Sequence, residues 1–65
     1  MGLVAEFVTI QAEIKRQTEK AICIEYHEEL IWLPRSQIEQ INFVAGEWAP
    51  KITMTAWIAK EKEII

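Results

Sequence analysis

The chain has few of the residues that cross-link a small protein or build a reactive site. Cysteine occurs once, as Cys23, and histidine once, as His27. A single cysteine excludes a disulfide within the chain, and two soft ligands are too few for a four-ligand zinc site. Glycine occurs only at positions 2 and 46, too few for a glycine-rich phosphate loop. We therefore expect no metal and no cofactor.

Positive charge is also scarce. Aspartate is absent, yet ten glutamates outnumber seven lysines and arginines and give a net charge of −3. Polynucleotide-binding proteins usually carry a basic balance or stripe, so this charge argues against a long nucleic acid as partner. No apolar run approaches the roughly 18 residues of a membrane span, and residues 1–6 do not resemble a signal peptide. With one reduced cysteine, these features predict a cytoplasmic protein without membrane contact.

The length of the chain is close to the lower limit for independent folding. A domain of this size buries only about 60% of the surface that its unfolded chain exposes. Half of the residues are hydrophobic, including Trp32, Trp48 and Trp57, and nothing covalent stabilises the fold. Small domains without a disulfide or a metal often gain stability from partner subunits. We therefore expect a single domain, residues 1–65, that forms a homo-oligomer.

Alternation of apolar and polar residues predicts several strands. Residues 6–16 (EFVTIQAEIKR) place four apolar side chains on one side: Val8, Ile10, Ala12 and Ile14. Similar patterns predict strands at 20–26, 29–33 and 51–57, with a polar turn at 17–19. The tail at 58–65 consists of good helix formers, with Ile58, Glu61 and Ile65 on one side, and predicts a short helix.

The hairpin between the second and third predicted strands can be tested by register. A two-residue turn at His27–Glu28 places aliphatic pairs on one face; the opposed residues are Tyr26 with Glu29, Ile24 with Ile31, and Ile22 with Leu33. The opposite face then holds Ala21, Cys23, Glu25, Leu30 and Trp32. Both faces are largely apolar, so something must cover the second face. However, His-Glu is a poor match for the primed turns, and a longer loop would exchange the two faces.

Between the third and last strands the sequence predicts short structures only. Ser36 and Glu39 have the spacing of a capping box, which indicates one helical turn after Pro34. Residues 41–44 are an apolar run, and residues 45–47 predict a turn. The order of elements is typical of a mostly β fold: a small OB-like or Tudor/Sm-like barrel of four to five antiparallel strands with a short C-terminal helix. The alternative is a three- to four-stranded sheet completed by a partner subunit.

Candidate catalytic groups are not assembled in the sequence. Cys23 lies between isoleucines, as buried and inert cysteines do, and His27 lies among charged residues in a predicted turn. Glu28 and Glu29 are neighbours whose side chains point apart, so they cannot flank one scissile bond. We therefore predict that the protein is not an enzyme.

Tryptophan, unlike cysteine, histidine and glycine, is frequent in this chain. Three tryptophans in a chain of this length either pack in the core or in a subunit interface, or line a pocket and stack on a planar ligand. In the second case, nearby polar and cationic side chains would complete the site. The predicted ligand-binding residues are Trp32, Arg35, Gln37, Trp57 and Lys60.

One stretch carries a resemblance. The run from Ile31 to Ile38 (IWLPRSQI), preceded by residues 20–22 and followed by residues 56–60 (AWIAK), resembles a group of short uncharacterised phage and prophage proteins over residues 18–62. In that group a W-hydrophobe-P-K/R-S-Q strand end precedes a C-terminal W-hydrophobe-A-K segment. Arg35 stands where lysine is commoner, and the hairpin lacks the Asp-Gly that such sequences often carry. The resemblance implies a phage accessory protein of the bacterial host cytoplasm.

These observations favour a binding protein. The first hypothesis is a homo-oligomer that binds a small nucleotide-like ligand, similar to phage proteins that sequester nucleotide immune signals and so counter host defence. The second is an acidic protein that binds and inhibits a host defence factor. The third is a single-stranded nucleic-acid-binding barrel in which Trp32 and Trp57 stack on bases.

Overall fold

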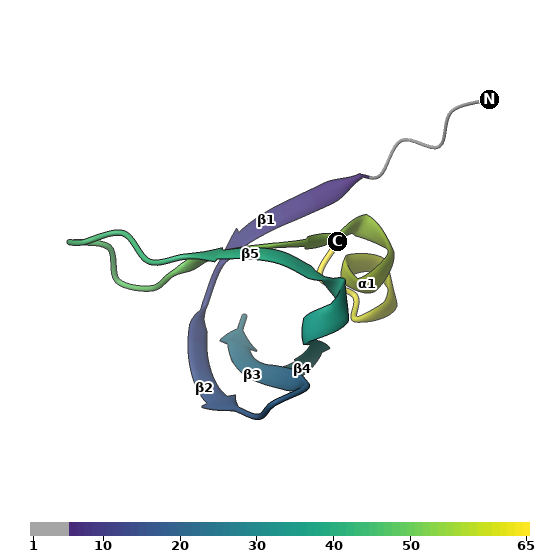
Figure 1. Ribbon diagram of the computed structural model, residues 1–65, viewed down its shortest axis with the longest axis horizontal. Coiled ribbons are helices and arrows are strands. Elements are labelled where there is room, and N and C mark those ends of the chain that lie inside the picture. Colours follow the sequence, from purple (N-terminus) through teal and green to yellow (C-terminus); the bar gives the residue numbers. More distant parts are fainter. Residues whose placement is uncertain (1–5) are drawn as a thin grey trace.

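The computed structural model describes residues 6–65, so the expectation about a signal peptide falls mainly on residues outside it (Figure 1). The described elements are the strands β1 (Phe7–Gln11), β2 (Glu13–Gln17), β3 (Ala21–Tyr26), β4 (Glu29–Pro34), β5 (Ile38–Asn42) and β6 (Lys51–Thr55), the 3₁₀ turn η1 (Arg35–Gln37) and the helix α1 (Ala56–Glu61). The strands form two antiparallel sheets, ordered β1-β6-β5 and β2-β3-β4. The predicted mostly β class with a short C-terminal helix is confirmed.

The first predicted strand is bent into two. Ala12 separates β1 from β2, is fully buried, and donates its N–H to the carbonyl oxygen of Pro50 at 3.2 Å. The small side chain lets the backbone approach its neighbour closely at this corner. The bend places β1 in one sheet and β2 in the other, so one continuous stretch of chain supplies an edge to each sheet.

The β3–β4 hairpin has the register that the sequence predicts. Tyr26 lies opposite Glu29, and the aliphatic pairs follow in step along both strands. His27 and Glu28 have φ angles of 51° and 67°, which is the left-handed pair required by a two-residue primed turn. Neither residue favours this conformation, so the burial of the aliphatic pairs outweighs the cost of the turn.

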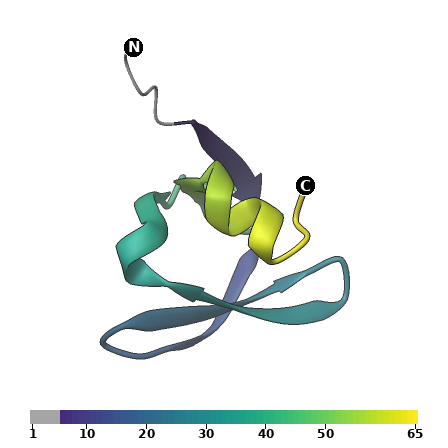
Figure 2. The same cartoon turned by 90° about the vertical axis from the view of Figure 1, so that its right-hand side faces the viewer.

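The core lies between the two sheets and is closed by α1. Five of its larger side chains are almost completely buried: Ile22, Ile24, Leu33, Ile52 and Met54. The side of β1 and β2 predicted to face inward does so, because Val8, Ile10, Ala12 and Ile14 all belong to this core or pack against it. Figure 2 shows α1 in front of the sheets, between η1 and the β3–β4 hairpin, where Ile58 and Ala59 are buried.

Several predicted boundaries are wrong. The predicted helical turn after Pro34 is present as η1, but the capping box does not form: η1 has no side-chain cap, and Ser36 lies inside the turn. The last strand ends at Thr55, because its hydroxyl accepts the N–H of Ile58 at 3.3 Å and starts α1 two residues earlier than predicted. The strand that follows η1 begins before the apolar run at 41–44, and the turn at 45–47 is present around Gly46.

The C-terminal end differs from the helical pattern as well. Ile64 packs against the core whereas Ile65 is exposed. The helix ends at Glu61, and Glu63 has a φ of 60°, so the chain reverses direction and the predicted helical face does not extend to Ile65.

The two sheets are not joined into a closed barrel by hydrogen bonds. Within residues 6–65, β4 and β5 are connected through η1 but do not pair with each other. The predicted barrel is therefore present only as two sheets packed face to face, linked at the Ala12 corner. This arrangement leaves β4 and β5 with free edges.

Candidate functional site

The structure does not gather the predicted ligand-binding residues into one cavity. Trp32 lies on the outer face of β4 and is 43% exposed, opposite Cys23 of β3. Trp57 and Lys60 are exposed on α1, which packs against the other sheet. These three side chains form no part of either hollow described below.

Arg35 and Gln37 are occupied by contacts within the chain. The Arg35 guanidinium donates from Nε to the Thr18 carbonyl oxygen at 3.0 Å and from Nη2 to Oε1 of Gln17 at 3.1 Å. Gln37 accepts the Thr55 hydroxyl at 2.8 Å. These bonds attach η1 to the β2–β3 turn and to the start of α1.

All three tryptophans are exposed in the single chain. Trp48 and Trp57 are 66% and 60% exposed, and Trp32 is also accessible. Packing in the core of one chain is therefore excluded for every tryptophan. An interface or a ligand site remains for each of them, and Trp48 borders one of the two hollows described below.

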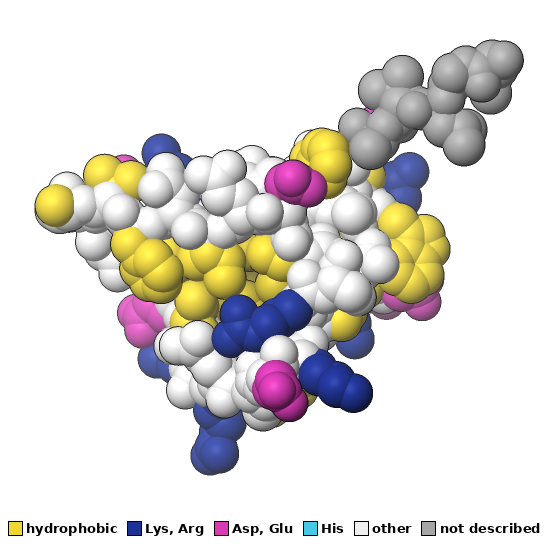
Figure 3. Space-filling model, viewed as in Figure 1, with side chains coloured by type: hydrophobic (Ala, Val, Ile, Leu, Met, Phe, Trp, Pro, Cys, Tyr) yellow, Lys and Arg dark blue, Asp and Glu magenta, His cyan; other side chains and the backbone are white. Residues whose placement is uncertain are grey.

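Trp48 belongs to a groove between β2 and the connection from β5 to β6, which we call the aromatic groove. Its volume is about 430 Å³. Its lining residues are Glu13, Ile14, Gln17, Phe43, Trp48 and Pro50. Figure 3 shows hydrophobic side chains gathered in a hollow between β5 and the strands of the other sheet, beside a Lys or Arg side chain.

Hydrogen bonds at the Ala12 corner hold the connection in place. The Gln11 side chain donates from Nε2 to the Ala49 carbonyl oxygen at 2.9 Å, next to the bond between Ala12 and Pro50. Ala49 is buried, so the residues on either side of it are fixed relative to β2. Gly46, with a φ of 88°, turns the tip of the connection back on itself. Trp48 is thus presented by an anchored segment.

The polar groups around the aromatic groove are mixed in charge. Glu13 bonds Lys15 at 2.9 Å, and Lys15 also reaches Glu25 at 3.2 Å. The hydrogen bonds to Glu13 and then to Glu25 raise the pKa of Lys15 above its ordinary value. Arg35 bonds the groove residue Gln17. The negative charge of Glu13 is therefore balanced by a close ammonium group.

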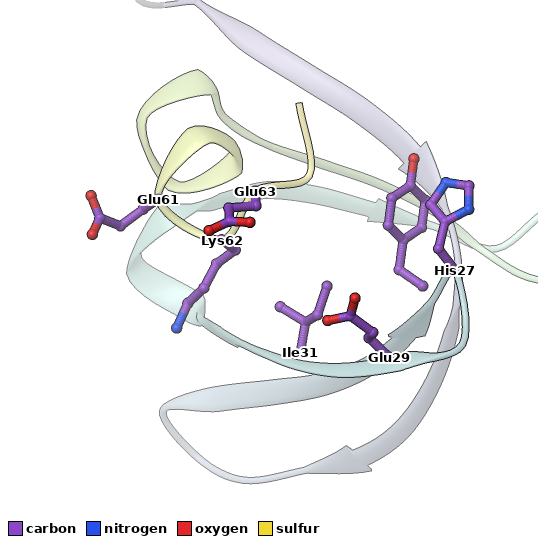
Figure 4. A pocket seen from close by; sticks show the side chains of 7 residues that line it. His27, Glu29, Ile31, Glu61, Lys62 and Glu63 are labelled. Carbon is purple, nitrogen blue, oxygen red and sulfur yellow. The ribbon is translucent and has the colours of Figure 1, made fainter.

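A second hollow of about 300 Å³ lies between the β3–β4 turn and the end of α1, and we call it the acidic pocket (Figure 4). Its lining residues are Tyr26, His27, Glu29, Ile31, Glu61, Lys62 and Glu63. The rings of Tyr26 and His27 meet edge to face, with centroids 4.2 Å apart. In Figure 4, the Glu61 side chain points away from the space while Ile31 points into it.

Over residues 6–65, no group of three or more histidine, cysteine or acidic side chains is placed to hold a metal ion. Cys23 is buried on the outer face of its sheet, and His27 is exposed at the hairpin tip. In the same part of the chain, no helix is long and apolar enough to cross a membrane.

Comparisons with protein families, with curated proteins and with solved structures found no match to this chain. The groove geometry and the residues themselves therefore carry any functional argument. Sequence reasoning missed Phe43 and Trp48, which lie in the connection between β5 and β6, as residues of the groove. Pro50, two residues after Trp48, was the available signal that this connection is ordered.

Proposed function

We propose that this protein is a non-enzymatic binding protein that holds a small planar, nucleotide-like ligand in the aromatic groove. The observation that carries the proposal is the pair of exposed aromatic rings, Phe43 and Trp48, on one rim of a groove with hydrogen-bonding groups on the other. Its volume lies within the range of small-molecule sites, roughly 300–1,000 Å³.

The chemistry of the groove suits a base with a small anionic group. A planar base gains about 1–3 kcal/mol from stacking on an aromatic side chain. Gln17 offers an amide to the edge of the base, and the Arg35 guanidinium bonds Gln17 beside the groove. Lys51 directly follows the groove residue Pro50, and its ammonium pairs with Glu47 at 3.9 Å. A long polyanion would meet the net charge of −3 and is disfavoured.

The resemblance over residues 18–62 supports a phage accessory protein in the bacterial host cytoplasm, where a nucleotide-binding protein could sequester immune signals. The exposed apolar side chains outside the groove, including Leu30, Trp32 and Trp57, support a homo-oligomer. The two packed sheets, with the strand bent at Ala12 and η1 between β4 and β5, support a half-open relative of the small barrels.

Fluorescence of a single tryptophan tests the ligand. In the double variant Trp32→Phe/Trp57→Phe only Trp48 emits, and we expect AMP, ADP-ribose or a cyclic dinucleotide to quench it in a saturable way. Phe43→Ala should weaken the affinity roughly 5- to 150-fold, which corresponds to the stacking energy. Gln40→Ala, an exposed glutamine outside the groove, should leave it unchanged. The proposal is wrong if the folded variant shows no saturable quenching by any of these nucleotides.

A second candidate function, inhibition of a host protein, is favoured by the acidic pocket. Glu29 and Glu63 border a hollow that also contains the Tyr26 ring, and this combination suits an arginine or lysine side chain of a basic partner. A Lys/Arg-rich peptide should then bind with an affinity that falls with salt and with Glu29→Gln/Glu63→Gln. Oligo-dT serves as the polymer control, because binding of it would favour the single-strand hypothesis instead.

A further inference from the structure

The free edge of β4 has unused hydrogen-bonding groups. Lys20 and Arg35 lie opposite each other just beyond the hairpin strands, and the Arg35 N–H donates to the Lys20 carbonyl oxygen at 2.8 Å. In an antiparallel ladder, hydrogen-bonded and non-hydrogen-bonded pairs alternate. Counting from this bond, the odd-numbered residues of β4 direct their backbone groups toward β3. Leu30 and Trp32 direct theirs outward.

These outward groups have no partner within residues 6–65. Beyond the ladder to β3, the described chain contains no hydrogen bond to the backbone of Leu30 or Trp32. The strand order places β4 at the edge of its sheet, and in both views the β3–β4 hairpin forms the lower side of the molecule (Figures 1 and 2). Two N–H and two C=O groups therefore face outward on one short strand.

This edge has little protection against strand addition: Pro34 occupies its last position, but no bulge or lysine lies along the strand. Natural edges are protected by bulges, lysines or inward-pointing charges. The registers of β2 and β5 are each interrupted by a bulge, and β2 carries Lys15 and Arg16. The pairing of β4 is regular over all six residues, and its outward side chains Leu30 and Trp32 are 66% and 43% exposed.

We propose that two copies of this chain pair through their β4 edges, antiparallel and about a two-fold axis at Ile31, to form a six-stranded sheet. The partner is a second copy because the edge is complementary to itself. In this register Leu30 lies opposite Trp32 of the second copy, and all four backbone groups of each copy find a partner. If the axis passed through Leu30, Trp32 would have to bond Glu28, which lies in the turn of the second copy. If it passed through Trp32, Leu30 would have to bond Pro34, which lacks an N–H.

Side chains and charges agree with this register. On the outer face, Trp32 of one copy packs beside Leu30 of the other, which covers the apolar face that the sequence predicted would need a cover. At each end, this register places His27 opposite Arg35 of the second copy, whose guanidinium is bonded to Thr18 and Gln17 of its own chain. The acidic turn and this cation therefore lie at the same end of the shared ladder, without a direct ion pair.

The inference deepens only the homo-oligomeric part of the proposed function and does not depend on the ligand. Sedimentation of the full chain should give twice the 7.6 kDa chain mass, with a monomer appearing on dilution. Leu30→Lys should give a folded monomer, because lysine protects an edge. The matched variant is Phe43→Lys, since Phe43 is also exposed but lies in the aromatic groove. This variant should remain a dimer and lose ligand binding, so the two proposals can fail independently.

Cysteine cross-linking tests the register in a Cys23→Ala background. Residues opposite each other in a non-hydrogen-bonded pair have Cα atoms about 4.5 Å apart, within disulfide range, whereas diagonal neighbours are roughly 7–8 Å apart. Ile31→Cys should therefore form a cross-linked dimer on mild oxidation, and Leu30→Cys and Trp32→Cys should not. Cross-linking at Leu30→Cys or Trp32→Cys without Ile31→Cys would overturn the register. A wild-type chain that stays monomeric up to millimolar concentration would overturn the dimer.

Discussion

The hairpin turn at His27–Glu28 offers a direct test of how packing overrides local preference. Both residues have positive φ angles, a conformation that costs a residue with a Cβ atom roughly 1–2 kcal/mol. Replacing the pair with Asn-Gly supplies the residues that this turn favours. Because all strand contacts remain, the double variant His27→Asn/Glu28→Gly should be more stable than the wild type.

The size of the effect follows from opposing contributions, one of which is the loss of the edge contact between the Tyr26 and His27 rings. Glycine at position 28 removes most of the steric cost of the turn. It also adds conformational freedom to the unfolded chain, which lowers the free energy of unfolding by about 0.5–1 kcal/mol. Asparagine at position 27 is one of the few residues besides glycine that adopt the left-handed region routinely. The net gain should be about 1 kcal/mol, equivalent to roughly 4–8 °C in Tm for a domain of this size.

Thermal unfolding by circular dichroism, at one fixed protein concentration, measures this gain. Glu19→Gly is the matched control, because Glu19 lies in the other turn of the same sheet and has no positive φ. The control should lose stability by roughly 0.5–1 kcal/mol. If the double variant melts at or below the wild-type temperature while the control behaves as expected, the left-handed turn is refuted.

Three further changes have defined outcomes. Leu33→Ala removes a fully buried side chain and should cost about 2–5 kcal/mol in urea unfolding; a loss below 1 kcal/mol would mean that the inter-sheet core is loosely packed. Thr55→Ala removes the hydroxyl that accepts the Ile58 N–H and bonds Gln37, and should cost about 1 kcal/mol and reduce the helical signal; an unchanged signal would contradict the cap. Trp32→Ala should leave the chain folded, because Trp32 is partly exposed, but should expose the Cys23 thiol opposite it; an unchanged rate of thiol modification would show that Trp32 does not cover Cys23.

The local pattern of residues was sufficient for most of the strands and for one register, but it did not identify β5 as a strand. Alternation identifies which side of a strand faces the core, since side chains on a strand point to opposite faces in turn. The aliphatic pairs Ile22–Leu33 and Ile24–Ile31 fix the hairpin because a slip by one residue would expose all of them. His27 and Glu28 by themselves argued against a two-residue turn, but the packing of the strands imposed that turn.

The candidate site was less accessible to sequence reasoning. Arg35 and Gln37 were predicted to contact a ligand, yet their side chains bond Gln17, Thr18 and Thr55 within the chain. Residue type indicates what a side chain can bind, but not whether a neighbour in space has already bound it.

The sequence by itself determined that this is a mostly β chain with an inward aliphatic face and an apolar second face on the β3–β4 hairpin. These properties depend on composition and on period-two alternation, which are local. Only the tertiary structure decided the bend at Ala12, the exposure of all three tryptophans and the meeting of Phe43 and Trp48 with β2. The corner joins Ala12 to Pro50, and the groove joins residues 13–17 to residues 43–50. These contacts depend on which backbone groups pair across the sheets, and no local pattern encodes that pairing.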